Sequence, residues 1–149
     1  MSLKTDIDKL RRASAAEILL LMEAMTLLCV VKAGVLTLPF RWLAALTGLE
    51  LSSATTAEKA GPEGDPEWVG KAVRAMAART PWKSTCLVQA ITGAIMLRRR
   101  GIPASLLLGV AKESGLIAHA WLKSGDVFVT GYAGHQTYRV ISVFTVSPR

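Results

Sequence analysis

The stretch from Pro81 to Pro103, PWKSTCLVQAITGAIMLRRRGIP, constrains the fold more than any other part of the sequence. Ser84 and Thr85 are both suited to cap the start of a helix, and an almost wholly apolar run follows. Three arginines then fall in the last turn, where cations interact favourably with the helix dipole. Gly101 and Pro103 are typical residues for ending a helix. A helix this apolar between its caps predicts a buried element at the centre of a domain.

Branched and aromatic residues are concentrated after this helix and predict four strands, at residues 105–110, 116–123, 127–132 and 139–146. Ser124, Gly125 and Asp126 predict a tight hairpin turn between two of them. Helices followed by a run of antiparallel strands are typical of an α+β fold, in which a central helix packs on an antiparallel sheet.

The first third of the chain predicts a helical extension. Apolar residues at spacings of three and four form one stripe from Leu20 to Val31, and Gly34 and Pro39 then interrupt it. A second short helix, from about Phe40 to Leu46, ends at Gly48, and a further helix runs from about Pro66 to Ala78.

The chain of 149 residues is long enough for one compact domain. Within it we expect a helical segment at residues 1–49, a surface loop at residues 50–67 and the core at residues 68–149. The loop boundary rests on its content of Ser, Thr, Gly, Pro and acidic residues.

Charge is unevenly distributed along the chain. Residues 1–67 have a balance of −2, whereas residues 68–149 have a balance of +9, within a total of +7. A basic domain attracts nucleic acid, anionic lipid or an acidic peptide, and composition does not choose among them. Because no RNA-binding aromatic signature is present, we expect no nucleic acid as a partner.

The apolar stretch at residues 15–46 contains four charges, so it lacks the uninterrupted run that a membrane span requires. A very hydrophobic helix pair that packs on the domain is predicted, with peripheral membrane contact as the alternative. The N-terminus lacks the features of a secretory signal, and two cysteines cannot form a disulfide scaffold. We expect a cytoplasmic protein, with membrane association as the alternative.

No pattern implies a metal or a cofactor, since Cys29, Cys86, His119 and His135 lack zinc-site spacing.

Two residues could carry chemistry. Cys86 falls at the start of the apolar helix, where free backbone amides favour a thiolate. His119 lies in a predicted strand that would pack against this helix, which would place its ring within hydrogen-bond reach of the sulfur. The alternative is that Cys86 is a small buried hydrophobic residue and that His119 is a structural histidine. Cys29, in the middle of an apolar helix, is expected to be structural and buried.

Several short motifs follow one another in the C-terminal part of the chain. They are Trp82, the pair Cys86-Leu87, Arg99-Arg100-Gly101, Gly109-Val110 and the run Ala118 to Trp121. In this order and spacing, over about residues 78–146, they resemble the leader peptidases of lasso-peptide maturation. These peptidases belong to the transglutaminase-like cysteine protease superfamily.

The resemblance implies a cysteine peptidase that removes the leader from a ribosomally synthesised lasso-peptide precursor. Cys86 would be the nucleophile, and His119 would be the general base and then the general acid. The family commonly places an Asp about a dozen residues after the histidine, where this chain has Thr130 and Gly131. Asp126, Thr130, a backbone carbonyl or Gln136 could orient His119 instead.

An oxyanion hole would use the Cys86 amide, with Trp82 or Gln89 as a second donor. The resemblance also implies three partners: the precursor with its leader peptide, a separate leader-recognition protein and an ATP-dependent lasso cyclase. Two other interpretations remain open at this point. One is a transglutaminase-like acyltransferase or amidase acting on another peptide, and the other is a non-catalytic scaffold of a peptide-maturation complex.

Overall fold

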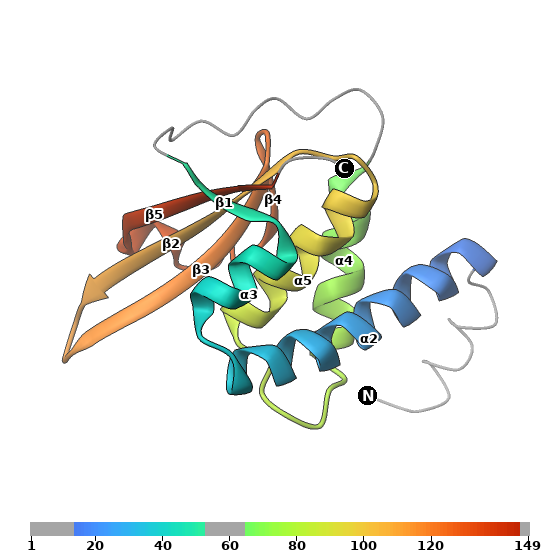
Figure 1. Ribbon diagram of the computed structural model, residues 1–149, viewed down its shortest axis with the longest axis horizontal. Coiled ribbons are helices and arrows are strands. Elements are labelled where there is room, and N and C mark those ends of the chain that lie inside the picture. Colours follow the sequence, from blue (N-terminus) through green and yellow to red (C-terminus); the bar gives the residue numbers. More distant parts are fainter. Residues whose placement is uncertain (1–13, 53–64, 147–149) are drawn as a thin grey trace.

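The computed structural model describes residues 14–52 and 65–146 (Figure 1). In chain order its elements are helices α2 (Ala15–Thr37) and α3 (Phe40–Thr47), strand β1 (Leu49–Ser52), helices α4 (Pro66–Ala77) and α5 (Cys86–Arg99), strands β2 (Ala104–Lys112), β3 (Leu116–Ser124) and β4 (Val127–Thr130), the short 3₁₀ helix η1 (His135–Thr137) and strand β5 (Arg139–Val146).

The strands form one antiparallel sheet in the order β1-β5-β2-β3-β4. The sheet is centred on β2, where Leu106 pairs with Leu122 of β3 on one side and with Phe144 of β5 on the other. β4 is a short edge strand and pairs with β3 only over Leu122–Ser124. Among the residues that the structure describes, the rest of β3, which includes His119, therefore has no paired strand on the β4 side.

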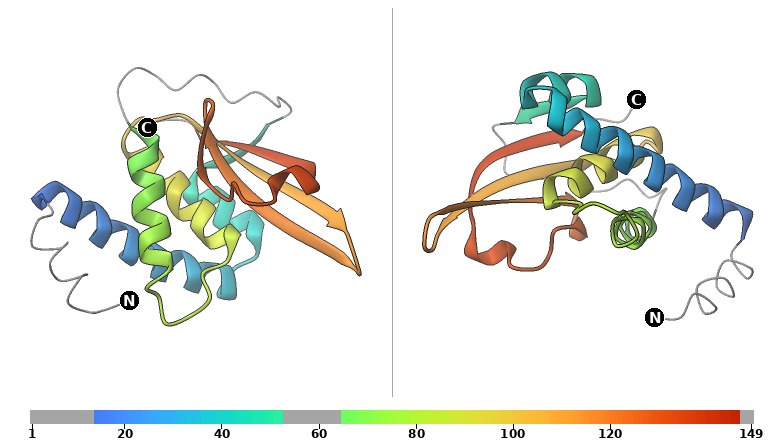
Figure 2. Two further views of the ribbon diagram at one scale, coloured as in Figure 1. Left: turned by 180° about the vertical axis from the view of Figure 1, so that it is seen from behind. Right: turned by 90° about the horizontal axis from the view of Figure 1, so that it is seen from below.

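The helices cover one face of this sheet in two layers. α5 contacts β2, β3 and β4, and α4 contacts β4 and α5, whereas α2 packs on α4 and α5 from outside (Figure 2). The main core lies between the sheet and these helices, and a smaller apolar cluster around Trp121 lies on the opposite face. These findings confirm the predicted α+β fold with a central helix on an antiparallel sheet.

α5 has the boundaries that its sequence predicted. Thr85 is the N-cap and its hydroxyl accepts a hydrogen bond from the Val88 amide at 3.5 Å. At the other end Gly101 adopts a positive φ of 68°, and the Ile102 amide donates to the Leu97 carbonyl. The buried residues of this helix are Val88, Ala90, Ile91, Thr92, Gly93, Ala94, Met96 and Leu97. The expectation of a central buried helix is therefore confirmed.

Two of the predicted element boundaries were wrong. Gly34 does not interrupt α2, which continues to Thr37. The glycine allows α3 to pack closely, since a Cβ at residue 34 would lie 3.0 Å from the Leu43 side chain. Residues 50–52 are not loop: they belong to β1, a fifth strand that pairs with β5 almost a hundred residues later. Residues 53–64 of the predicted loop lie outside the described residues.

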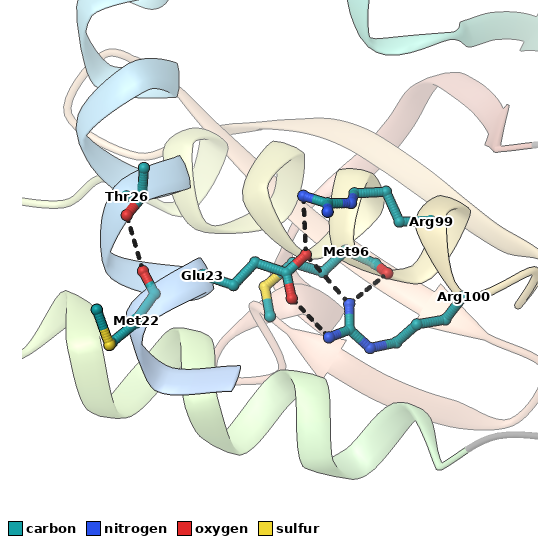
Figure 3. A network of polar contacts seen from close by, with 6 residues as sticks. All are labelled: Met22, Glu23, Thr26, Met96, Arg99 and Arg100. Atoms are coloured by element: carbon teal, nitrogen blue, oxygen red, sulfur yellow. Dashed lines mark hydrogen bonds and ion pairs between the residues drawn. The ribbon is translucent and has the colours of Figure 1, made fainter. Parts of the chain in front are cut away.

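One side-chain prediction was also wrong. Cys29 is exposed, because α2 buries its opposite side through Ala24, Leu28 and Val31. Arg99 and Arg100 at the end of α5 are exposed and also make tertiary contacts. Arg99 and Arg100 form ion pairs with Glu23 of α2 at 3.2 and 2.5 Å (Figure 3). These pairs fasten the C-terminal end of α5 to α2.

Candidate functional site

Cys86 is the first residue of α5, and a small hydrogen-bond network fixes the chain that leads to it. The Thr80 hydroxyl contacts the Ala77 carbonyl at 2.8 Å, the Trp82 carbonyl at 2.9 Å and the Ser84 hydroxyl at 2.9 Å. Thr85 then caps the helix directly before the cysteine. The Cys86 thiol is half-buried, at a helix end whose free amides favour negative charge.

His119 lies on β3, on the stretch that β4 does not cover. Its ring stacks on Trp121 with centroids 5.8 Å apart and contacts Tyr138 at 5.0 Å. Its Nε2 forms a hydrogen bond of 2.8 Å with the carbonyl oxygen of Gly131. A carbonyl oxygen only accepts, so Nε2 is the donor, and in the neutral ring Nδ1 is the nitrogen that remains to accept a proton.

Gly131 follows β4 in a conformation that favours glycine, with a φ of 75°. A Cβ atom at this position would lie 2.5 Å from the Ala120 carbonyl oxygen and 2.7 Å from the Trp121 Cβ. The chain therefore passes β3 at backbone distance, which brings the Gly131 carbonyl to His119. Thr130 and Gly131 stand where the resemblance described above leads one to expect an acidic side chain. The group that contacts His119 there is the main-chain oxygen of Gly131.

Cys86, His119 and Gly131 all line one open cavity of about 760 Å³. This volume lies within the range of about 300–1,000 Å³ that is usual for ligand sites. Its wall combines the start of α5, the uncovered stretch of β3, the turn before β4, the segment after β4 and one side of α4. The lining residues are Glu67, Arg74, Cys86, Gln89, His119, Asp126, Val127, Phe128, Gly131, Tyr132 and Ala133.

Cys86 and His119 thus border the same cavity, although no hydrogen bond joins them within residues 14–52 and 65–146. Hydrogen bonds of a catalytic pair are often long before the substrate binds and shorten in the complex. The structure therefore places both groups at one cavity, but not in hydrogen-bond contact with each other as the sequence led us to expect.

The other candidate residues are distributed around this cavity in different ways. Asp126 lines it and is exposed in the hairpin turn, while the hydrogen-bond partner of His119 is Gly131. The Thr130 hydroxyl is buried and has no hydrogen-bond partner among the described residues. Gln89 lines the cavity and donates to the Ser84 carbonyl at 3.0 Å. The Trp82 indole nitrogen is buried, likewise without a partner in the part of the chain described, and Trp82 is not among the cavity-lining residues.

No pattern in the sequence indicated the contact between α4 and β4 that supports the Gly131 segment. Gly70 lets the two elements approach, because a Cβ there would collide with the Val129 carbonyl oxygen. The same oxygen accepts a hydrogen bond from the Arg74 guanidinium. α4 therefore contacts β4 at Val129, two residues before Gly131.

We expect Gly70→Ala to destabilise the protein by about 1–3 kcal/mol, although alanine is the better helix former, because its methyl group would force α4 away from Val129. Chemical unfolding followed by circular dichroism measures this free energy. Gly115→Ala is the control, since nothing lies within 4 Å of its Cβ position, and it should change stability by less than about 0.5 kcal/mol. A stabilised Gly70→Ala variant would contradict the close approach.

Comparison with known proteins gives one family. The model of the transglutaminase-like superfamily matches residues 34–143, from the last turn of α2 into β5, which includes Cys86, His119 and Gly131. No curated protein and no solved structure gives a significant match.

Proposed function

Because this chain belongs to the transglutaminase-like superfamily, we propose that it is a cysteine peptidase in which Cys86 and His119 form the catalytic pair. The observation that supports this most directly is the shared cavity. Its lining includes the half-buried Cys86 at the start of α5 and His119, whose Nε2 is hydrogen-bonded to a carbonyl oxygen. Cysteine peptidases and acyltransferases are both common in this superfamily. Both reactions begin with attack by a cysteine thiolate, so the same pair of residues would serve either one.

The proposed reaction has two steps. His119 Nδ1 takes the thiol proton of Cys86, and Sγ attacks the carbonyl carbon of the scissile peptide bond. The His119 imidazolium then gives that proton to the departing amine as the C–N bond breaks, which leaves a thioester on Cys86. Water attacks the thioester with His119 as general base, and a carboxylic acid and the free thiol result.

Transition-state charge develops on the carbonyl oxygen during both steps. The Cys86 amide at the first position of α5 is a donor with no partner within its own helix, and it is the first candidate for an oxyanion hole. The Gln89 side chain is the second, since it lines the cavity, although one of its N–H groups donates to Ser84.

We propose further that the substrate is a lasso-peptide precursor, cut between leader and core so that the core gains a free amine. The support is the set of motifs from Trp82 to Trp121, which resembles the leader peptidases of this pathway in order and spacing. In this proposal the chain acts in the cytoplasm with a separate leader-recognition protein. An ATP-dependent cyclase then uses the new amine.

The test is to incubate the purified chain with a precursor peptide, with and without its leader-recognition protein, and to analyse the products by mass spectrometry. A peptidase yields two fragments whose masses sum to the precursor plus one water. An added primary amine should not appear in the products. An amine adduct would instead indicate acyl transfer, and an unchanged precursor in the presence of the recognition protein would contradict the peptidase proposal.

A further inference from the structure

α2 has a second apolar face, on the side away from the core. Ala24, Leu28 and Val31 are buried against the rest of the protein, and the residues on the opposite side of the helix are exposed. We call this opposite side the outer face of α2. It consists of Ala15, Leu19, Met22, Thr26, Cys29, Val30, Ala33, Leu36 and Thr37. Leu19 is 66% exposed, Met22 62%, Val30 61% and Leu36 71%, so the packing of the domain leaves large apolar side chains in solvent.

α3 continues this apolar surface. Trp42 is 56% exposed and Leu46 is 71% exposed. The guanidinium of Arg41 lies 5.9 Å from the Trp42 ring. Between Ala15 and Thr47, Arg41 is the single charged residue that is exposed, since Glu17, Glu23 and Lys32 are all partly buried.

The polar side chains near the outer face are satisfied within the protein. The Thr26 hydroxyl donates to the Met22 carbonyl at 2.9 Å, and the Thr37 hydroxyl donates to the Ala33 carbonyl at 2.8 Å. Figure 3 shows that Glu23 points instead toward the arginines at the end of α5. The outer face of α2 therefore presents hydrocarbon with no hydroxyl or charged group turned outward along about 35 Å of helix.

This chemistry favours lipid over a protein partner. Protein interfaces carry about one hydrogen bond per 100–200 Å², together with a polar rim, and the outer face of α2 offers neither. A bilayer surface needs no such partners from an inserted face, and tryptophan and arginine are residues that settle at its headgroup level. We propose that the outer face of α2, with Trp42 and Leu46, binds the surface of an anionic lipid bilayer, with Arg41 toward the headgroups.

The packing of α2 decides how it would lie. By length and composition α2 is apolar enough to cross a membrane. Its inner face, however, belongs to the main core with α4 and α5, and a spanning helix would have to leave that core. The helix therefore lies in the bilayer surface rather than across it. At this face the exposed cation is Arg41, beside Trp42, and it favours anionic headgroups. The net charge of +7, which comes from residues 68–149, adds a long-range attraction to an anionic surface.

This orientation leaves the candidate active site accessible. No residue of α2 or α3 lines the cavity that contains Cys86. In the right view of Figure 2, α2 and α3 lie along one side of the molecule, and the segment after β4 lies on the opposite side. A membrane on the helical side would leave the cavity turned toward the solution.

The test is co-sedimentation of the full chain with vesicles of phosphatidylcholine alone, and with vesicles in which roughly half of it is replaced by phosphatidylglycerol. We expect binding to the anionic vesicles and weaker binding to the neutral ones. The double variant Val30→Glu/Leu36→Glu should bind at least about tenfold more weakly, because both positions are exposed and lie in the apolar face. Trp42→Ala should also weaken binding, without adding a charge.

Leu116→Glu is the matched control, because Leu116 is 78% exposed at the hairpin end of β3 and lies outside the outer face. It should bind like the unmodified chain, and circular dichroism shows whether each variant is folded. The proposal is overturned if the folded chain stays in the supernatant with both vesicle types, or if the double variant binds undiminished. A dimer that the double variant loses, with no vesicle binding, would assign the face to a second copy of the chain instead. None of these measurements depends on peptidase activity.

Discussion

Replacing Cys86 by alanine should abolish leader cleavage, with a loss of about 10⁴-fold or more in rate, while the protein remains folded. In the proposed mechanism the Cys86 sulfur forms the acyl intermediate, and no other residue that lines the cavity can take this role. Alanine is well tolerated at the first position of α5, because Thr85 supplies the cap and the Cys86 side chain is only half-buried. The measurement is the initial rate of fragment formation, followed by mass spectrometry.

Cys29→Ala is the control for this experiment. Cys29 is exposed on α2 and does not line the cavity, so its removal should leave the cleavage rate unchanged. Thermal unfolding of both variants should match that of the unmodified chain within a few degrees. A folded Cys86→Ala variant that still produces both fragments at a substantial rate would show that this thiol is not the nucleophile. Maturation supported by that variant without cleavage would favour the non-catalytic scaffold.

Gly131→Ala should lower kcat by about 100-fold with little change in KM. The new Cβ would lie 2.5 Å from the Ala120 carbonyl oxygen and 2.7 Å from the Trp121 Cβ, so the segment must move away from β3. That movement takes the Gly131 carbonyl from His119 Nε2 and releases the ring from the orientation it now holds. Because the carbonyl does not contact the substrate in this mechanism, the effect should fall on the chemical step rather than on binding.

Gly134→Ala separates this positioning effect from backbone strain. Gly134 also has a positive φ, of 76°, but nothing lies within 4 Å of its Cβ position. It should cost a similar amount of conformational strain, about 1 kcal/mol, and leave kcat nearly unchanged. Equal losses of kcat in the two variants would contradict a role for the Gly131 carbonyl. Full activity of Gly131→Ala would contradict that role as well. The free energy of unfolding of both variants is measured alongside, so that a loss of folding is not mistaken for a loss of kcat.

Within residues 14–52 and 65–146 no carboxylate is hydrogen-bonded to His119, and the Gly131 carbonyl makes that contact instead. A carboxylate would orient the ring and also stabilise the imidazolium by its charge. The Gly131 carbonyl supplies orientation and a dipole, but no charge. The Arg74 guanidinium and Gly70 add rigidity, since both act on the Val129 carbonyl at the end of β4. The third member of the site is thus a supported segment of backbone.

Much of the fold could be predicted from the sequence because its signals are local. The caps of α5, the turn at Gly125 and the end of α3 at Gly48 depend on residues within a few positions of one another. β1 could not be predicted in this way. Its four residues, LELS, become a strand only by pairing with β5, where Glu50 lies opposite Thr145. The buried side of α2 was predicted, because the stripe from Leu20 to Val31 contains the buried residues Ala24, Leu28 and Val31. The apolar character of the opposite side was not predicted.

The sequence by itself determined that a cysteine stands at the capped start of a central helix and that a histidine follows on a strand of the sheet. Both statements rest on residue types and spacings, which local rules relate to structure. Only the tertiary structure decided what holds His119, because a main-chain carbonyl is present at every residue and has no signature of its own. The position of the Gly131 carbonyl depends on how closely Gly131 passes Ala120 and Trp121. It also depends on the packing of α4 against the end of β4.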